Sequence, residues 1–248
     1  GGFPTTPIHS QTIHNKYKIN TTMNTPYNNH LSLYIENIKH KLDNDPRYAS
    51  LFEREAIIEQ SEKVGKWLKD HPNSSLADIK NRHKDLKKLV DPLMERAENK
   101  YDLEKEVSDL KRRVDEDKRL AHLSDSERNT VKAACDDFLK WSKSNPGASI
   151  ADMKNKKKQA DKIVQPIIEK GEKRSGVEAL AEKALDRIHS DVILSALDDK
   201  ERKDVSQKAE EVLRAIDSDP NMSMVGLMQH EKEVEDAINP VINKADNR

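Results

Sequence analysis

An internal repeat with a period of 74 positions constrains the fold of this chain more than any other feature of its sequence. Comparison of residues 66–94 with residues 140–168 gives 13 identities in 29 positions, and Trp67 aligns with Trp141. A third copy keeps the pattern more than the identities, and it has Ala215 at the tryptophan position. We expect the register to hold without a gap. Repeats of this length predict a series of similar small units. Two series of prolines mark the repeat: Pro72, Pro146 and Pro220, and Pro92, Pro166 and Pro240.

Each copy carries the same signals for where helices begin and end. A capping box, in which a side chain and a glutamate satisfy free amides at a helix start, is expected in all three copies. The boxes are Ser50-x-x-Glu53, Ser124-x-x-Glu127 and Asp198-x-x-Glu201. The residue before each proline of the first series disfavours the α conformation, so one helix should stop there. A serine then stands where the next helix needs its N-cap: Ser75, Ser149 and Ser223.

Apolar residues at helical spacing follow each of these starts, with charged residues on the opposite face. In the second copy the first stripe is Val131, Cys135, Phe138 and Leu139. The second stripe of the first copy is Leu76, Ile79, Leu86, Leu89, Val90, Leu93 and Met94, and it has counterparts one and two repeats further on. Since the second series of prolines falls inside this stripe, we expect a kink or a restart there.

A further helix precedes each pair, and it is shorter in the first copy, around residues 31–42. The fold class is therefore all-α: three tandem small bundles of about three helices each, over residues 31–97, 98–174 and 175–248. No Gly or Pro lies between Pro92 and Pro146, which predicts a continuous helix near residues 93–120 joining the first two copies. Gly171 and Gly176 should permit bending between the second and third.

Residues 1–30 are predicted to form a disordered tail, because they hold two Lys, no acids and no apolar period. They lack the pattern of a secretory signal, and they have no Arg for a mitochondrial presequence, so we expect a cytoplasmic protein. The chain begins with Gly, which leaves two interpretations open: Met23 is the natural start, or the N-terminus of a longer protein is missing.

Composition excludes several classes of protein. One Cys excludes a disulfide framework, and a mean hydropathy of -0.93 without a long apolar run excludes a transmembrane helix. A net charge of -1 gives no reason to expect nucleic acid as a partner. The third copy is acidic, with 10 Lys and Arg against 17 Asp and Glu. This negative charge either contacts a basic partner or lies on a face that is exposed to solvent, and we favour the second interpretation.

No catalytic motif is present, and we expect no catalytic, cofactor-binding or metal-binding residue. The nine His do not pair at i,i+3 or i,i+4 beside carboxylates to build a metal face. Cys135 lies on an apolar stripe and is interpreted as core. We expect Trp67 and Trp141 to cap bundles, and the basic run 154–158 to form a face that is exposed to solvent. For Met222, Met224 and Met228, a place in the core is favoured over an adaptable binding surface.

Three stretches of the first copy resemble the C-terminal helical lid of the seventy-kilodalton heat-shock chaperones. They are residues 33–39 (Leu-Tyr-Ile-Glu-Asn-Ile-Lys), residues 62–68 ending in Trp-Leu, and residues 91–94 (Asp-Pro-Leu-Met). The second copy is similar through Cys135, six residues before Trp141, and through residues 165–168. The third is similar through residues 239–242 but has lost the tryptophan. The resemblance covers roughly residues 31–245.

In that family the ATPase domain and the peptide-gripping β-sandwich carry the activity, and this chain resembles neither. It also lacks the Glu-Glu-Val-Asp tail of cytosolic members and an endoplasmic-reticulum retention signal. The resemblance implies the role of a lid, which closes over substrate and contributes to partner contacts. We therefore expect a non-enzymatic, chaperone-related module that binds client or chaperone proteins, without nucleic acid or membrane partners. A helical scaffold, the C-terminal part of a larger ATP-driven chaperone, and self-association stay open.

Overall fold

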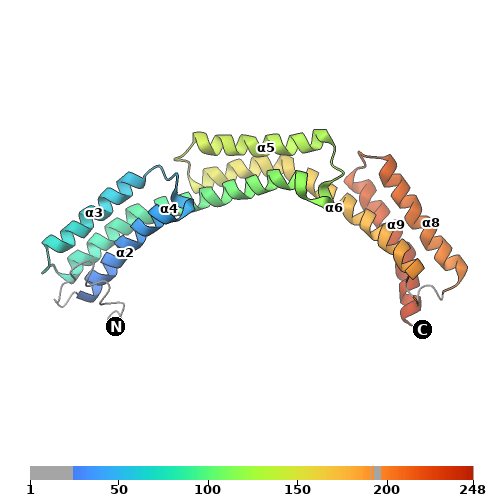
Figure 1. Ribbon diagram of the computed structural model, residues 1–248, viewed down its shortest axis with the longest axis horizontal. Helices are drawn as coiled ribbons and strands as arrows, with labels where there is room; N and C mark the ends of the chain where they lie inside the picture. Colours follow the sequence, from blue (N-terminus) through green and yellow to red (C-terminus); the bar gives the residue numbers. More distant parts are fainter. Residues whose placement is uncertain (1–24, 191, 193–196, 248) are drawn as a thin grey trace. The chain divides into compact units, whose positions relative to one another are not determined.

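The computed structural model describes residues 25–190, 192 and 197–247, and within them every regular element is helical. The predicted all-α class is thereby confirmed (Figure 1). The α-helices are α2 (Thr25–Asn44), α3 (Arg54–Asp70), α4 (Leu76–Glu116), α5 (Asp125–Ser144), α6 (Ile150–Ser190), α8 (Asp199–Ser218) and α9 (Met224–Asp246). Two short 3-10 turns, η1 (Pro46–Tyr48) and η2 (Lys118–Leu120), follow α2 and α4.

The predicted tail is only partly covered by the described residues, since residues 1–24 lie outside them. Residues 25–30 are not tail, because they form the first turns of α2. Tyr27 packs against a hydrophobic core, and Asn28 is buried. The first helix is therefore 20 residues long and is not shortened as predicted.

The chain divides into two compact units. One holds residues up to Lys105 together with Trp141–Lys154, and the other holds Glu106–Lys140 and Asn155–Arg248. The first predicted copy lies whole in the first unit, the third lies whole in the second unit, and the second copy is divided between them. The grouping into three bundles stays a prediction.

The core of the first unit is built from the predicted stripes of α2, α3 and α4, with Tyr48 of η1 buried among them. Two predicted core residues, Leu76 and Leu89, are exposed instead. Leu76 is the first residue of α4, and Leu89 lies about 100° around the helix from the buried Val90, at one side of the stripe. The buried residues of this core are Leu31, Ile35, Ile38, Leu42, Tyr48, Ile57, Ile79, Leu86, Val90, Met94 and Ala97.

The second unit contains an equivalent core from the end of α6 and from α8 and α9, which lie side by side (Figure 1). Its buried members confirm most of the predicted stripes of the third copy: Val177, Ala184, Ile188, Val205, Ala209, Val212, Ile216, Leu227, Val234, Ile238 and Val241. Ala181 is also buried but was not predicted, whereas the predicted Leu180 is only partly buried. The second copy also buries most of its stripe residues, whereas Ile163, the counterpart of Leu89, is exposed.

The predicted helix stops and serine caps are confirmed. Helices α3, α5 and α8 each end two residues before their proline. The hydroxyls of Ser75, Ser149 and Ser223 accept backbone N–H groups three residues on, at 3.1, 3.0 and 3.1 Å. Each serine thus satisfies one free amide at the start of α4, α6 or α9.

Two of the three predicted capping boxes form contacts. Ser124 and Glu127 bond reciprocally at 3.0 and 3.2 Å, and Asp198 accepts from the Glu201 amide at 2.9 Å. The Ser50 box is wrong, because α3 begins at Arg54 with Glu53 at its N-cap and no side-chain cap.

The Ser50 capping box does not form because the repeat register is broken between η1 and α3. The starts of η1 and η2, at Pro46 and Lys118, are separated by 72 positions, and so are the buried residues Tyr48 and Leu120. The following glutamates, Glu53 and Glu127, are separated by 74, so the first copy is two residues shorter at this point. Its structural counterpart of Ser124 is Phe52, which cannot cap. The expectation of a register without a gap is therefore wrong here.

Helices α4, α6 and α9 run through Pro92, Pro166 and Pro240 without a restart. All three prolines are exposed, so water can reach the carbonyl groups that lose their helical partner. The predicted continuous helix between the first two copies is confirmed by α4, which ends at Glu116.

The predicted bend at Gly171 and Gly176 is not present as a helix break, since α6 continues through both. Gly171 is buried, and a Cβ atom there would lie 2.9 Å from Leu120 Cδ2 and 3.1 Å from Leu123 Cδ2. This glycine therefore allows α6 to approach the segment after η2 closely, and hinge formation is not its role. Gly176 has open space around it.

Candidate functional site

No group of three or more His, Cys, Asp or Glu side chains that could hold a metal ion occurs among the described residues. None of the described helices is long and apolar enough to span a membrane. Two surface features of the described residues are considered as candidate sites: a joint that recurs between successive copies, and a groove in the first unit.

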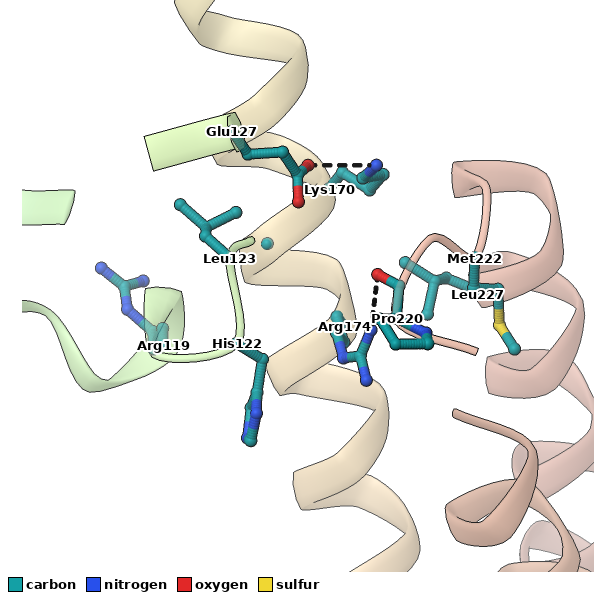
Figure 2. Close-up of a pocket in the computed structure, with 10 residues that line it drawn as sticks. Arg119, His122, Leu123, Glu127, Lys170, Arg174, Pro220, Met222 and Leu227 are labelled. Carbon is teal, nitrogen blue, oxygen red and sulfur yellow. Dashed lines mark hydrogen bonds and ion pairs between the residues drawn. The ribbon is translucent and has the colours of Figure 1, made fainter. Parts of the chain in front are cut away.

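The joint of the second unit brings together the segment after η2, the middle of α6 and the turn between α8 and α9 (Figure 2). Arg174 of α6 donates to the backbone oxygens of Ile216 and Pro220 at 2.8 and 3.0 Å. Because the last carbonyls of a helix lack helical partners, this guanidinium satisfies the end of α8. The Arg174 guanidinium and the Glu127–Lys170 pair beside it are engaged in internal contacts, so we interpret the joint as structural.

The first unit contains the same joint. Its pocket lies against α4, and most of the residues that line it precede residues of the second joint by 72 or 74 positions. Arg47, Ser50, Leu51, Arg96, Ala97, Lys100 and Pro146 correspond to Arg119, His122, Leu123, Lys170, Gly171, Arg174 and Pro220. The repeat therefore includes the way in which one copy meets the next.

An ion pair recurs at the same interval and connects the start of one helix to the helix that contains the proline. Glu53 pairs with Arg96, Glu127 with Lys170 at 3.2 Å, and Glu201 with Lys244 at 2.6 Å. Partial burial raises the pKa of Glu127, but hydrogen bonds from Ser124 and Lys170 outweigh it and leave the pKa below its usual value.

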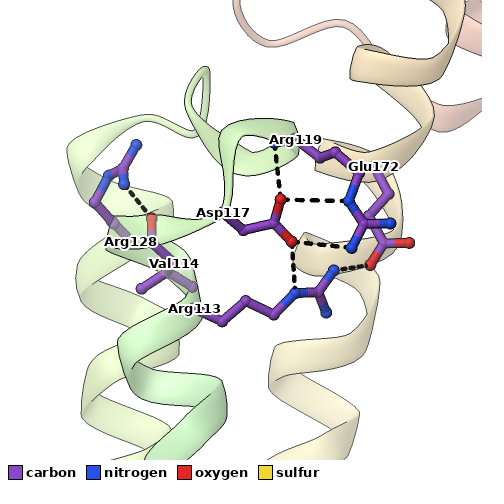
Figure 3. A network of polar contacts seen from close by, with 6 residues as sticks. All are labelled: Arg113, Val114, Asp117, Arg119, Arg128 and Glu172. Atoms are coloured by element: carbon purple, nitrogen blue, oxygen red, sulfur yellow. Dashed lines mark hydrogen bonds and ion pairs between the residues drawn. The ribbon is translucent and has the colours of Figure 1, made fainter.

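A second polar network holds the end of α4 to η2 and α6 (Figure 3). Asp117 accepts Arg113 Nε at 2.8 Å and Arg119 Nη2 at 3.0 Å, and Arg113 also pairs with Glu172. The hydrogen bonds from Arg119 and then Arg113 hold the pKa of Asp117 far below its ordinary value. Since both arginines and both acids are satisfied within the network, it stabilises the joint and offers no free group to a ligand.

The groove of the first unit is different, because its four lysines form no ion pair with any described residue. It is open, has a volume of about 630 Å³, and lies where α2 and α4 run together. Tyr27 and His30 come from α2. The other lining residues come from α4: Lys80, His83, Lys84, Lys87, Lys88, Asp91 and Pro92.

His83 forms the floor of this groove, with only 6% of its surface exposed. Its Nδ1 lies 3.2 Å from the Tyr27 hydroxyl, and the rings of Tyr34 and His30 pack on it with centroid distances of 4.8 and 5.5 Å. Burial, then the charges of His30 and Lys87, lower the pKa of His83, which favours the neutral imidazole. Its Nε2 is buried and has no hydrogen-bond partner in the part of the chain that the structure describes.

Four lysines surround His83, and none of the four forms an ion pair with any described residue. Lys80 and Lys87 place their ammonium groups 5.7 and 6.0 Å from the ring centroids of Tyr27 and Tyr34. The one carboxylate of the lining, Asp91, accepts the Tyr34 hydroxyl at 2.7 Å. The groove therefore carries an excess of positive charge around an unpaired ring nitrogen.

This groove was not identified from the sequence. His83 interrupts the predicted stripe of α4 between Ile79 and Leu86, and its place on that stripe was a signal of an unusual environment. The comparison of position 83 with the same position in the other copies, Lys157 and Glu231, would have drawn attention to it.

The other predicted residues have mixed outcomes. Cys135 is buried, as predicted, and burial raises its pKa to about 11. Trp67 packs against the first core and stacks on His71 at 5.2 Å, which is consistent with a capping role. Met222 packs against the third-copy core, whereas Met228 is exposed, so the core interpretation of Met228 is wrong.

The basic run 154–158 is a solvated face only in part. Lys154 and Lys158 are exposed, but Lys157 lies between two carboxylates, 3.1 Å from Glu106 and 3.0 Å from Asp161. The prediction is wrong for Lys157, because α4 presents Glu106 opposite it.

Comparison with known proteins gives a distant relationship. The chain is 30% identical over 104 residues to heat shock cognate 70 kDa protein 3 of Dictyostelium discoideum, an alignment that covers 41% of this chain and 16% of that protein. No family model matches the chain, and no solved structure matches it. The chain is thus similar, over a small part of the relative's length, to a seventy-kilodalton heat-shock protein.

Proposed function

We propose that the chain is a non-enzymatic, chaperone-related module that binds other proteins through a tandem array of three lid-like helical bundles. The observation that carries the proposal is the similarity to a heat-shock cognate protein in a chain whose described regular elements are all helical. The partners are client or chaperone proteins, and the compartment is the cytoplasm.

The tandem arrangement is supported by the recurring contacts of the structure. The Glu–Lys or Glu–Arg pair appears in all three copies, and the same joint appears twice. Repeat proteins use such copied contacts to build extended binding surfaces.

Binding of unfolded proteins requires exposed apolar side chains, and the described surface offers them. Val225 and Met228 of α9 are 75% and 53% exposed, and their spacing of three places them on one face of the helix. Methionine adapts its shape to different apolar partners. Phe52 is 74% exposed in the first unit. We assign these residues to client contact.

The test is suppression of aggregation. The full chain is added to a heat-unfolded model enzyme, and light scattering is followed with and without ATP. We expect scattering to fall as the chain approaches equimolar amounts, with no effect of ATP. The variant Val225→Ser/Met228→Ser should suppress less, whereas Gln229→Ser, exposed in the same turn, should behave as the parent. Unchanged scattering, together with failure to bind any chaperone, would refute the proposal.

A helical scaffold is the second candidate, and the length of two helices favours it. Helices α4 and α6 each have 41 residues, and each contributes to two successive predicted copies. A chain that binds no client and gives an extended envelope in X-ray scattering would fit the scaffold. The third candidate, the C-terminal part of a larger ATP-driven chaperone, is tested by the coding sequence upstream.

A further inference from the structure

The repeat provides an internal comparison for the groove around His83. In the second copy its position is occupied by Lys157, which pairs with Glu106 and Asp161. Glu106 is the second-copy counterpart of Tyr34, and Asp161 is the counterpart of Lys87. The same place is therefore closed in the second copy by a set of internal ion pairs.

The third copy closes the place in another way. Glu231 is the counterpart of His83, and both of its oxygens lie 3.1 Å from Lys173 Nζ. Lys173 is the counterpart of Tyr27, two copies further on. The second and third copies thus use different charged residues, but in both of them ion pairs connect the first and last helix of the copy at this place.

Among the described residues, the first copy alone has no ion pair at this place. Uncharged Tyr27 lies where the third copy has Lys173, and uncharged Tyr34 lies where the second copy has Glu106. His83 lies where the other two copies have Lys157 and Glu231. The four groove lysines form no ion pair with any described residue. Lys80, Lys84 and Lys88 follow one another at i,i+4, where like charges repel and destabilise a helix. The stability of the fold does not explain this arrangement of lysines. Binding of a negatively charged ligand explains it.

We propose that this groove binds an acidic segment of a partner protein, with carboxylates on Lys80, Lys84, Lys87 and Lys88. Because the Tyr27 hydroxyl can donate to Nδ1 of the neutral ring, His83 Nε2–H is left as a buried donor for one carboxylate. From Lys80 to Lys88 the helix rises by about 12 Å, the length of three or four residues of extended chain. The segment is therefore short and carries several Asp or Glu.

A protein segment fits the groove better than a nucleic acid. Single-stranded nucleic acids bind on aromatic faces that are free to stack with bases. Here the ring of Tyr34 packs on His83, and ammonium groups of Lys80 and Lys87 lie over Tyr27 and Tyr34. This inference rests on the proposed protein-binding function and names the chemistry of one partner.

The test is fluorescence anisotropy of a fluorescein-labelled decapeptide rich in Glu and Asp, titrated with the full chain. The variant Lys80→Gln/Lys84→Gln/Lys88→Gln is compared with Lys154→Gln/Lys158→Gln/Lys162→Gln, its counterpart in the second copy. Both variants change the net charge equally, and all six side chains are exposed. We expect the first variant to weaken binding about tenfold or more, and the second to weaken it less than about twofold.

A further variant, His83→Phe, retains an aromatic ring and removes the Nε2 donor, and it should weaken binding about threefold or more. Three results would overturn the inference: an equal loss in both triple variants, no loss in the first, or tighter binding of an oligothymidylate than of the peptide. The aggregation assay depends on Val225 and Met228 and does not use this groove, so the two proposals can fail separately.

Discussion

Replacing Gly171 and Gly176 with alanine, one at a time, tests whether close packing or flexibility explains these glycines. Both residues lie inside α6, so each substitution should gain about 1 kcal/mol of helix propensity. At Gly176 nothing lies within 4 Å of the new Cβ, and the gain should appear in full. At Gly171 the new Cβ would meet Leu120 and Leu123, which are both buried.

Overpacking of a well-packed core costs about 1–3 kcal/mol. The two variants should therefore differ by about that amount, with Gly176→Ala more stable than the parent and Gly171→Ala no more stable or less. The measurement is the urea midpoint followed by far-UV circular dichroism. The first copy has Ala97 at the position of Gly171, but Tyr48 instead of Leu120 opposite it. Equal stabilisation by both alanines would refute the packing argument, and it would leave chain flexibility as the explanation of both glycines.

Three further predictions follow from single contacts. Ser149→Ala should cost about 1 kcal/mol in chemical unfolding because Ser149 caps α6, whereas Ser50→Ala should be neutral because Ser50 caps nothing; the reverse order would contradict the cap assignment. Since the pKa of Asp117 is lowered in the fold, its contribution to stability is complete above the unfolded pKa of about 4 and is lost as the pH falls toward the folded value. The urea midpoint of Asp117→Asn should thus change less than that of the parent between pH 5 and pH 2, and parallel curves would refute this. Cys135, buried and with a raised pKa, should react with a thiol reagent only in the unfolded chain, and rapid labelling of the native chain would show that the thiol is accessible.

Local signals predicted much of the fold. Helix stops before proline, serine caps and apolar stripes depend on a few neighbouring residues, and these predictions agree with α3 to α6, α8 and α9. The Ser50 box failed because the repeat was treated as one unbroken register. The matching positions of η1 and η2 and the matching burial of Tyr48 and Leu120, which the unbroken register does not align, reveal the missing pair of residues.

Contacts between distant segments were harder to predict. The role of Gly171 depends on Leu120 and Leu123, which reach it from a distant part of the sequence. Leu89 and Ile163 are exposed although the next residues, Val90 and Val164, are buried, and spacing alone does not define which side of the stripe faces the neighbouring helices. The groove around His83 requires both α2 and α4 to be placed, although the contrast with Lys157 and Glu231 was already present in the sequence.

The most direct test of the proposed function is a contact map of the chain with an unfolded client. A photo-reactive amino acid is placed at Met228 on α9, or at the exposed Asp204 on α8 as the control. The full chain is then irradiated with a heat-unfolded or a native model enzyme. We expect crosslinks from position 228 to the unfolded enzyme, few from position 204, and none to the native enzyme. Equal crosslinking from both positions, or none from position 228, would contradict a client-binding function.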